Sequence, residues 1–279
     1  MCGIVGVVGN SNAVDILIQG LEKLEYRGYD SAGIYVTDAP DKGCLVKSVG
    51  RIADLRAKIS SDVKGSTGIG HTRWATHGQA TEDNAHPHTS ETGRFVLVHN
   101  GVIENYLQIK EEYLQGHKFK GQTDTEIAVH LIGKFVDEDG LSVLEALKKS
   151  LHIIQGSYAF ALVDSQAPDT IYVAKNKSPL LIGVGEGYNM VCSDAMAMIR
   201  ETSQFMEIHD KELVVLTKDA ITVTDYEGNA IERGTYTAEL DLSDIGKGTY
   251  PYYMLKEIDE QPTVMRKLIS TYADDEGNI

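Results

Sequence analysis

The chain has 279 residues, of which 42% are hydrophobic and 24% are charged, a balance that excludes a disordered protein. Its 26 basic and 41 acidic residues give a formal net charge of −15, which excludes a sequence-independent nucleic-acid binder and disfavours an anionic membrane surface as a partner. Three widely spaced cysteines, Cys2, Cys44 and Cys192, predict free thiols in a reducing compartment, so we expect a cytoplasmic protein.

The predicted elements begin with a short buried strand at residues 2–9, where small and β-branched residues run without polar interruption to a turn. This stretch lacks a basic n-region and is too short for a signal peptide or a membrane span, so Cys2 should begin the folded domain. A helix capped by Ser11 or Asn12 should follow. Its apolar residues recur at helical spacing and are Val14, Leu17, Ile18, Leu21 and Leu24.

Strand-like runs occupy most of the remaining chain, in two groups separated by three helices. The first group covers residues 32–37, 44–49, 67–72 and 95–99, and the second covers 157–163, 170–174, 180–184, 190–193, 212–217 and 221–226. Helical periodicity places the helices within residues 103–114, 128–136 and 143–151. This order predicts an α+β layered fold with mostly antiparallel sheets, because turns between the late strands are too short for crossover helices.

The last predicted element has apolar residues without a partner in the rest of the chain. Residues 252–261 carry an amphipathic pattern, Pro262 should interrupt it, and residues 264–269 resume it before a polar end. We therefore expect a connector with a broken helix that packs against another part of the protein.

Cys2 is the first residue whose position suggests chemistry. Removal of Met1 would give it a free α-amine with a pKa of about 7.7 to 8, so that one residue would carry a nucleophilic thiol and a general base. The simpler interpretation is a small buried residue at the start of a strand.

Six short motifs in order decide between these interpretations. They are residues 1–6 (MCGIVG), 25–33 (EYRGYDSAG), 71–78 (HTRWATHG), 86–88 (HPH), 99–105 (HNGVIEN) and 123–126 (TDTE). Together they resemble the class II glutamine amidotransferase domain, with an N-terminal cysteine, of the glucosamine-6-phosphate synthase family (glutamine:fructose-6-phosphate aminotransferase, isomerising), over residues 2 to about 266. Amidophosphoribosyltransferases and asparagine synthetases share the Cys-Gly-Ile start and an Asn-Gly pair, but the second and third motifs resemble the sugar-phosphate branch.

The resemblance implies an N-terminal nucleophile hydrolase fold, an αββα sandwich of two mainly antiparallel sheets between helical layers. It implies a glutamine amidotransferase domain at residues 2–250 and a linker, or the start of a sugar-phosphate isomerase domain, at 251–279. The implied reaction hydrolyses L-glutamine to L-glutamate and ammonia through a Cys2 γ-glutamyl thioester, without a metal or organic cofactor. In the homo-oligomeric full-length enzyme, the ammonia would convert fructose 6-phosphate to glucosamine 6-phosphate for amino-sugar biosynthesis, an activity not expected from residues 1–279 alone.

The resemblance also assigns site residues. Cys2 would be the nucleophile, and Asn100 and Gly101 would form the oxyanion hole. The residues implied to bind glutamine are Arg73, Trp74, Thr76, His77, Gly101 and Asp124. A guanidinium fork suits the substrate's α-carboxylate and a carboxylate suits its ammonium, which explains Arg73 and Asp124. Arg27 matches a residue near the nucleophile.

Four of these residues have a simpler structural interpretation. Asn100 and Gly101 would form a turn between a strand and a helix, and Arg73 would belong to a surface ion pair. Thr123 and Glu126 would form a capping box, which places Asp124 in the first turn of a helix, where an acidic residue is favoured in any case.

Three other functions fit parts of the sequence. Five histidines, at positions 71, 77, 86, 88 and 99, suggest a metal site, but their spacing matches no compact ligand pattern. Glycines at 3, 6 and 9 suggest nucleotide binding, but G-x-x-G-x-x-G differs from the dinucleotide fingerprint. A non-catalytic glutamine sensor is the alternative if Met1 is retained, because the Cys2 nitrogen would then be an amide without a basic lone pair.

Overall fold

The computed structural model describes residues 2–75, 78–238 and 250–272. The chain divides into two compact units, Met1–Ala238 and Glu239–Ile279. Among the described residues, no helix combines the length and the apolar character that crossing a membrane requires. The first unit contains both sheets and every described residue of the predicted site.

One antiparallel sheet of the first unit has eight strands, in the order β14-β11-β9-β10-β1-β4-β2-β3. It combines strands from both ends of the chain, so β1 lies between β4 and β10. The strands are β1 (Gly3–Val8), β2 (Ser31–Thr37), β3 (Cys44–Val49), β4 (Thr67–Arg73), β9 (Leu181–Val184), β10 (Asn189–Cys192), β11 (Gln204–Glu207) and β14 (Tyr236–Thr237).

The second antiparallel sheet has six strands, in the order β13-β12-β8-β7-β6-β5. Its longest pairing joins β6 to β7. The strands are β5 (His88–Thr89), β6 (Phe95–Ile103), β7 (Gly156–Asp164), β8 (Ile171–Asn176), β12 (Glu212–Leu216) and β13 (Ile221–Asp225).

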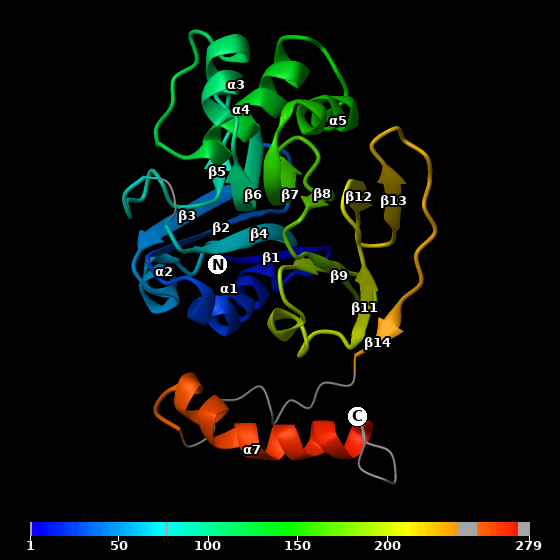
Figure 1. The fold of residues 1–279 in the computed structure, drawn as a ribbon. Helices are drawn as coiled ribbons and strands as arrows, with labels where there is room; N and C mark the ends of the chain where they lie inside the picture. The colour runs from blue at the N-terminus through cyan, green and yellow to red at the C-terminus, as the bar shows by residue number, and fades with distance from the viewer. Residues whose placement is uncertain (1, 76–77, 239–249, 273–279) are drawn as a thin grey trace. The chain divides into compact units, whose positions relative to one another are not determined.

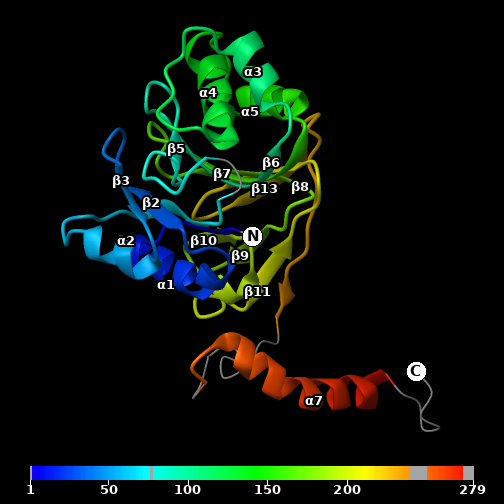
Figure 2. The ribbon, with the colours of Figure 1, turned by 60° about the vertical axis from the view of Figure 1, so that its left-hand side comes forward.

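Helices cover the outer face of each sheet, which confirms the predicted αββα sandwich (Figures 1 and 2). The helices α1 (Ala13–Leu24) and α2 (Ile52–Lys58) pack on the eight-stranded sheet. The other sheet carries α3 (Tyr106–Tyr113), α4 (Asp124–Asp137) and α5 (Val143–Ile153). Two short 3₁₀ helices, η1 (Glu25–Arg27) and η2 (Ala195–Ala197), lie in the connections.

The side chains that point into the space between the two sheets include three from the predicted site motifs. Ile4 of β1, Ile69 of β4 and Val98 of β6 all belong to the core between the two sheets. Because strand side chains alternate between faces, Cys2, His71 and Asn100, each two residues from one of these, project toward the same interior. The alternation of side chains along each strand therefore directs three polar side chains, from distant parts of the sequence, into the space between the sheets.

Several predicted boundaries are wrong. Asn100 and Gly101 do not form a turn, because β6 continues to Ile103 and pairs Asn100 with Ala159 and Gly101 with Tyr158 of β7.

Asn12 occupies the N-cap position of α1, as predicted, but its side chain makes no capping hydrogen bond. Four short elements, α2, β5, β11 and β14, were not predicted, and two of them, β5 and β14, have only two residues each, too few to show a period.

In the second unit, one helix, α7 (Tyr253–Tyr272), continues through Pro262. The predicted interruption is therefore wrong. Proline removes one backbone donor and crowds the preceding turn, but a helix of 20 residues keeps its other backbone hydrogen bonds on both sides of that position.

Candidate active site

A cavity of about 410 Å³ lies where the N-terminus, the end of β4, strand β6 and the start of α4 converge. Its volume is in the usual range for a small-molecule site. Among the residues that line it are six of the predicted site residues, Cys2, Arg73, Trp74, Asn100, Gly101 and Asp124. The other two, Thr76 and His77, lie outside the described residues. Arg27 also lines the cavity, and its guanidinium pairs with Asp194 at 3.0 Å.

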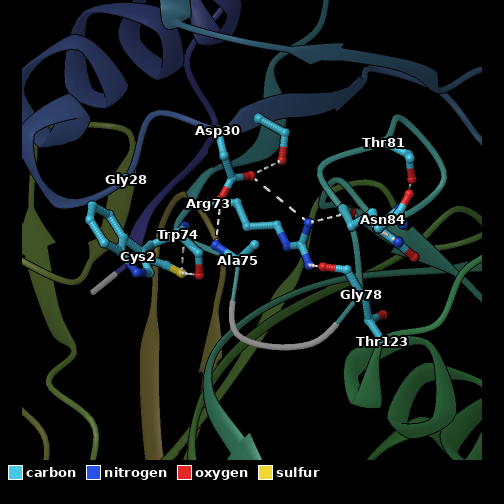
Figure 3. A network of polar contacts seen from close by, with 12 residues as sticks. Cys2, Gly28, Asp30, Arg73, Trp74, Ala75, Gly78, Thr81, Asn84 and Thr123 are labelled. Carbon is cyan, nitrogen blue, oxygen red and sulfur yellow. Dashed lines mark hydrogen bonds and ion pairs between the residues drawn. The ribbon is translucent and has the colours of Figure 1, made fainter.

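The Cys2 thiol lies beside the backbone of Trp74 (Figure 3). Its Sγ accepts a hydrogen bond from Trp74 N at 3.2 Å and donates one to Trp74 O at 3.6 Å. Burial raises the pKa of this thiol, and the Trp74 N–H and the positive charge of Arg73 only partly oppose that effect. The thiol is therefore protonated at neutral pH and needs a base before it can act as a nucleophile.

Asn100 connects Cys2 to a buried histidine. Its Nδ2 donates to Cys2 O at 3.1 Å, and its Oδ1 faces His71 Nε2 at 3.0 Å. His71 Nε2 also lies 3.1 Å from His99 O. Since both neighbours of Nε2 are oxygen acceptors, Nε2 must carry the proton, and this orients the Asn100 amide with its NH₂ group toward Cys2.

Gly101 follows Asn100 in β6 with a positive φ of 135°. A Cβ atom at this position would lie 2.1 Å from the backbone oxygen of Ser157. Only glycine fits both the conformation and the space, so the pairing with β7 explains why glycine stands beside Asn100.

Arg73 is only 4% exposed, so the interpretation as a surface ion pair is wrong. Its Nη1 lies 3.9 Å from Asp30 Oδ1 and donates to Gln79 O at 3.1 Å, and its Nη2 donates to Gly78 O at 3.4 Å (Figure 3). Gly28 packs against the same backbone, since a Cβ there would lie 2.5 Å from Arg73 C. Asp30 also accepts a hydrogen bond from Ala75 N, so the 25–33 motif supports the end of β4.

Asp124 begins α4 and is 5% exposed. Its Oδ2 accepts a hydrogen bond from Ile103 N at 2.8 Å, which holds the helix start against the end of β6. The Thr123 half of the predicted capping box is confirmed, because Thr123 Oγ1 accepts from Glu126 N at 3.2 Å. The reciprocal half is wrong, since the Glu126 carboxylate accepts instead from the N–H groups of Lys120 and Gly121, each at 2.8 Å.

Four of the five histidines that suggest a metal site, His71, His86, His88 and His99, are buried beside the cavity, and the rings of the first three pack against one another. The His71 and His86 rings lie 4.1 Å apart, and the His86 and His88 rings 4.8 Å apart. Their nitrogens contact separate partners: His86 Nδ1 accepts from His99 N, His88 Nε2 faces Thr123 Oγ1 and His99 Nδ1 faces Thr125 Oγ1. Within the described part of the chain, these histidines therefore support the site's backbone and do not converge as metal ligands.

The buried rings of His71, His86 and His88 should make the fold sensitive to acid. Burial lowers the pKa of His71 to about 3 and places the pKa values of His86 and His88 well below the ordinary value of 6.5. These three histidines gain protons on unfolding below about pH 6.5. Their contribution to the free energy of unfolding is therefore fully present above about pH 6.5 and is lost as the pH falls toward the pKa values of the folded state. The free energy of unfolding should fall by about 1 kcal/mol per pH unit for each histidine below about pH 6.5.

Urea denaturation at a series of pH values between 7 and 5 measures this loss. The exposed His152, changed to Gln, provides a matched control whose pH profile should follow that of the unchanged protein. A stability that stays constant between pH 7 and pH 5 would contradict the prediction.

Comparisons with known proteins provide independent evidence. The family model of the glutamine amidotransferase domain matches residues 50–236. The chain is 84% identical over its full length to glutamine–fructose-6-phosphate aminotransferase (isomerizing) of Streptococcus pyogenes serotype M1, and 83% and 80% identical to the proteins of that name from Streptococcus mutans serotype c and Streptococcus pneumoniae. It spans 46% of the length of each of these relatives.

Two solved structures are similar to about four fifths of this chain. The glutamine phosphoribosylpyrophosphate amidotransferase of B. subtilis, complexed with ADP and GMP, matches 82% of this chain and 50% of its own, with 29% sequence identity and a TM-score of 0.70. A structure described as the allosteric regulatory enzyme of purine biosynthesis matches 81% of this chain and 49% of its own, with 29% identity and a TM-score of 0.71.

Proposed function

This chain belongs to the glutamine amidotransferase family, and on that premise we propose that residues 2–250 hydrolyse L-glutamine to L-glutamate and ammonia with Cys2 as the nucleophile. The observation that carries the proposal is the convergence of a thiol, an oriented amide, a guanidinium and a carboxylate on one cavity. Release of glutamate and ammonia from glutamine by the purified chain is the test, and the absence of both products would overturn it.

The first step activates and uses the thiol. After removal of Met1, the α-amine of Cys2 accepts the thiol proton, directly or through a water molecule. The thiolate then attacks the side-chain amide carbon of glutamine, and the negative charge moves to the amide oxygen. Because burial raises the pKa of the thiol, a base on the same residue meets the need that this environment creates.

The second step stabilises that charge and releases the products. The Asn100 Nδ2 group and the Gly101 N–H donate to the oxyanion. The tetrahedral intermediate collapses, the proton held by the α-amine passes to the leaving nitrogen, and ammonia departs to leave a γ-glutamyl thioester on Cys2. Water then hydrolyses the thioester to glutamate and restores the thiol. All the groups in this sequence belong to the chain, the substrate or water.

Substrate recognition uses the two opposite charges that glutamine carries on its α-carbon. Arg73 binds the α-carboxylate through its planar fork, and Asp124 binds the α-ammonium. Both side chains are at least 95% buried, so each interaction forms where water screens it little. We also propose that Trp74, Thr76 and His77 contact the bound glutamine; Trp74 is half-exposed beside the cavity and packs edge-on against Tyr29.

Replacing His71 with leucine should lower kcat on the order of 10-fold and change KM little. Leucine fills similar space but removes the N–H that orients the Asn100 amide, and an oxyanion donor acts mainly on the transition state. Steady-state glutaminase kinetics measure the effect, and His71→Gln, which keeps an N–H donor, should recover part of the rate.

A double-mutant cycle separates positioning from a general loss of structure. If His71 acts through Asn100, then His71→Leu should have almost no further effect on kcat in an Asn100→Ala background. Losses of rate that simply multiply in the double variant would contradict this role.

We further propose that residues 251–279 connect the glutaminase domain to a sugar-phosphate isomerase domain of a longer, homo-oligomeric protein. Relatives more than 80% identical to this chain are about twice its length and are named for a reaction with fructose 6-phosphate. In that protein the ammonia would convert fructose 6-phosphate to glucosamine 6-phosphate. The helix α7 exposes apolar side chains suited to packing against further structure, among them Met254, Leu255, Ile258, Met265, Leu268 and Ile269.

A further inference from the structure

We propose that Glu91, His117 and His130 form a binding site for a divalent transition-metal ion, with Zn²⁺ as the best match. None of these three residues lines the Cys2 cavity, and glutamine hydrolysis does not use them. They come from three segments: Glu91 lies in the turn between β5 and β6, His117 in the loop between α3 and α4, and His130 in α4.

The donor atoms already lie at the separations that a metal requires. His117 Nδ1 is 2.9 Å from Glu91 Oε2 and 3.2 Å from His130 Nδ1, and all three donor atoms lie within 4.8 Å of one another. A four-coordinate Zn²⁺ with bonds of about 2.0 to 2.1 Å separates its ligand atoms by about 3.3 Å. To reach that geometry, Glu91 Oε2 and His130 Nδ1 would have to approach each other by at most about 1.5 Å, and the other two separations would change by less than about 0.5 Å.

Neighbouring groups contact all three donor residues and help to hold them in place. His117 Nε2 lies 3.2 Å from Glu138 Oε1, the carboxylate–histidine arrangement that orients metal-bound imidazoles. Glu91 Oε1 accepts from Lys118 N at 3.3 Å, which leaves Oε2 directed at the cluster. The His130 ring packs against Phe119, with the ring centres 4.6 Å apart.

The three donor atoms have fewer protons between them than their mutual contacts require. A neutral imidazole has one N–H, and with that proton on Nε2, His117 donates a hydrogen bond to the Glu138 carboxylate. The lone pair of His117 Nδ1 then faces Glu91 Oε2 and His130 Nδ1. These three atoms are all electron-pair donors, and His130 can supply at most one proton to lie between them. A cation among them satisfies all three; a protonated His117 between two carboxylates is the alternative that the experiment below distinguishes.

The donor set indicates the class of metal. Two imidazole nitrogens and one carboxylate suit Zn²⁺ and similar transition metals, whereas Mg²⁺ and Ca²⁺ prefer oxygen ligands alone. Burial lowers the pKa of His130 to about 4, which keeps this ring neutral and able to bind a metal at pH 7. A cavity of about 130 Å³ and the exposed Glu91 open the cluster to solvent, so water would complete the coordination.

Titration of the purified chain with Co²⁺ and then Zn²⁺ tests the proposal. We expect one equivalent of Co²⁺ to bind with visible d–d bands and no thiolate-to-cobalt charge-transfer band, and Zn²⁺ to displace it and raise the Tm. His117→Ala should weaken Zn²⁺ binding at least about 100-fold, and Glu138→Gln should weaken it about 10- to 100-fold. The exposed His152→Ala is the matched control and should bind as the unchanged protein does.

Glutaminase activity measured in each variant without added metal shows that the fold is intact. Three results would each overturn the proposal: no saturable binding, a thiolate band that identifies a cysteine as ligand, or the same Zn²⁺ affinity in His117→Ala. The first of these would identify the cluster as a protonated His117 held between Glu91 and Glu138.

Discussion

Replacing Cys2 with alanine should reduce glutamine hydrolysis by at least about 10⁴-fold, to the background of the assay. The proposed mechanism routes every product molecule through a bond to Cys2 Sγ, so no other group can substitute for this thiol. Alanine removes only the Sγ atom and its two contacts with Trp74, so the fold should be unchanged. Ammonia release by the purified variant measures the effect, with circular dichroism as the check on folding.

The other thiols provide the control for this experiment. Cys44 is partly buried and Cys192 is fully buried, and neither lines the cavity. Cys44→Ala should therefore hydrolyse glutamine at the normal rate. Substantial turnover by Cys2→Ala would overturn the nucleophile assignment. Mass spectrometry of the intact chain shows in the same samples whether Met1 has been removed, and an active protein that retains Met1 would overturn the role of the α-amine.

Replacing Arg73 with alanine should lower kcat/KM for glutamine on the order of 100-fold or more, because a buried carboxylate would lose a charge-assisted, two-point contact. Substrate analogues isolate that contact. Aminobutanamide, which is glutamine without its α-carboxylate, should be hydrolysed about equally by Arg73→Ala and by the unchanged protein. Glutaramic acid, which lacks only the α-ammonium, should lose about as much as glutamine does.

Asp124→Asn is the reciprocal control. It should impair glutamine and aminobutanamide and leave glutaramic acid almost unaffected, because the proposed partner of the Asp124 carboxylate is the α-ammonium group, which glutaramic acid lacks. A general folding defect would lower activity on all three substrates by the same factor. Equal losses for the three substrates in Arg73→Ala would therefore contradict a direct contact with the α-carboxylate.

Elements with a repeated pattern were predictable from the sequence, and elements defined by their partners were not. The helix α1 and the strand β1 coincide closely with their predicted ranges, since the first shows a clear helical period and the second an uninterrupted run of small and β-branched residues. The two-residue strand β5 exists only because it pairs with β6. The same pairing effect explains the error at Asn100, where β7 extends β6 through residues whose types favour a turn.

The site shows the same division. Its chemistry was predictable because the motifs name a thiol, an amide, a guanidinium and a carboxylate, and the described residues among them line one cavity. The groups that support them were not assigned roles from the sequence. His71 was considered only as a metal ligand, and its contact with Asn100 joins β4 of one sheet to β6 of the other. Ser178 and Pro179 line the cavity without any motif to mark them.

The sequence by itself determined the reactive groups, the strand and helix periods and the family, because these depend on residue types and on spacing along the chain. Only the tertiary structure decided how those groups are oriented and protonated. Burial between the sheets raises the pKa of the Cys2 thiol and keeps His71 neutral, and the N–H at His71 Nε2 holds the Asn100 oxygen, which turns the Asn100 NH₂ group toward Cys2. These effects depend on distance and desolvation, which are properties of packed elements and not of any one segment.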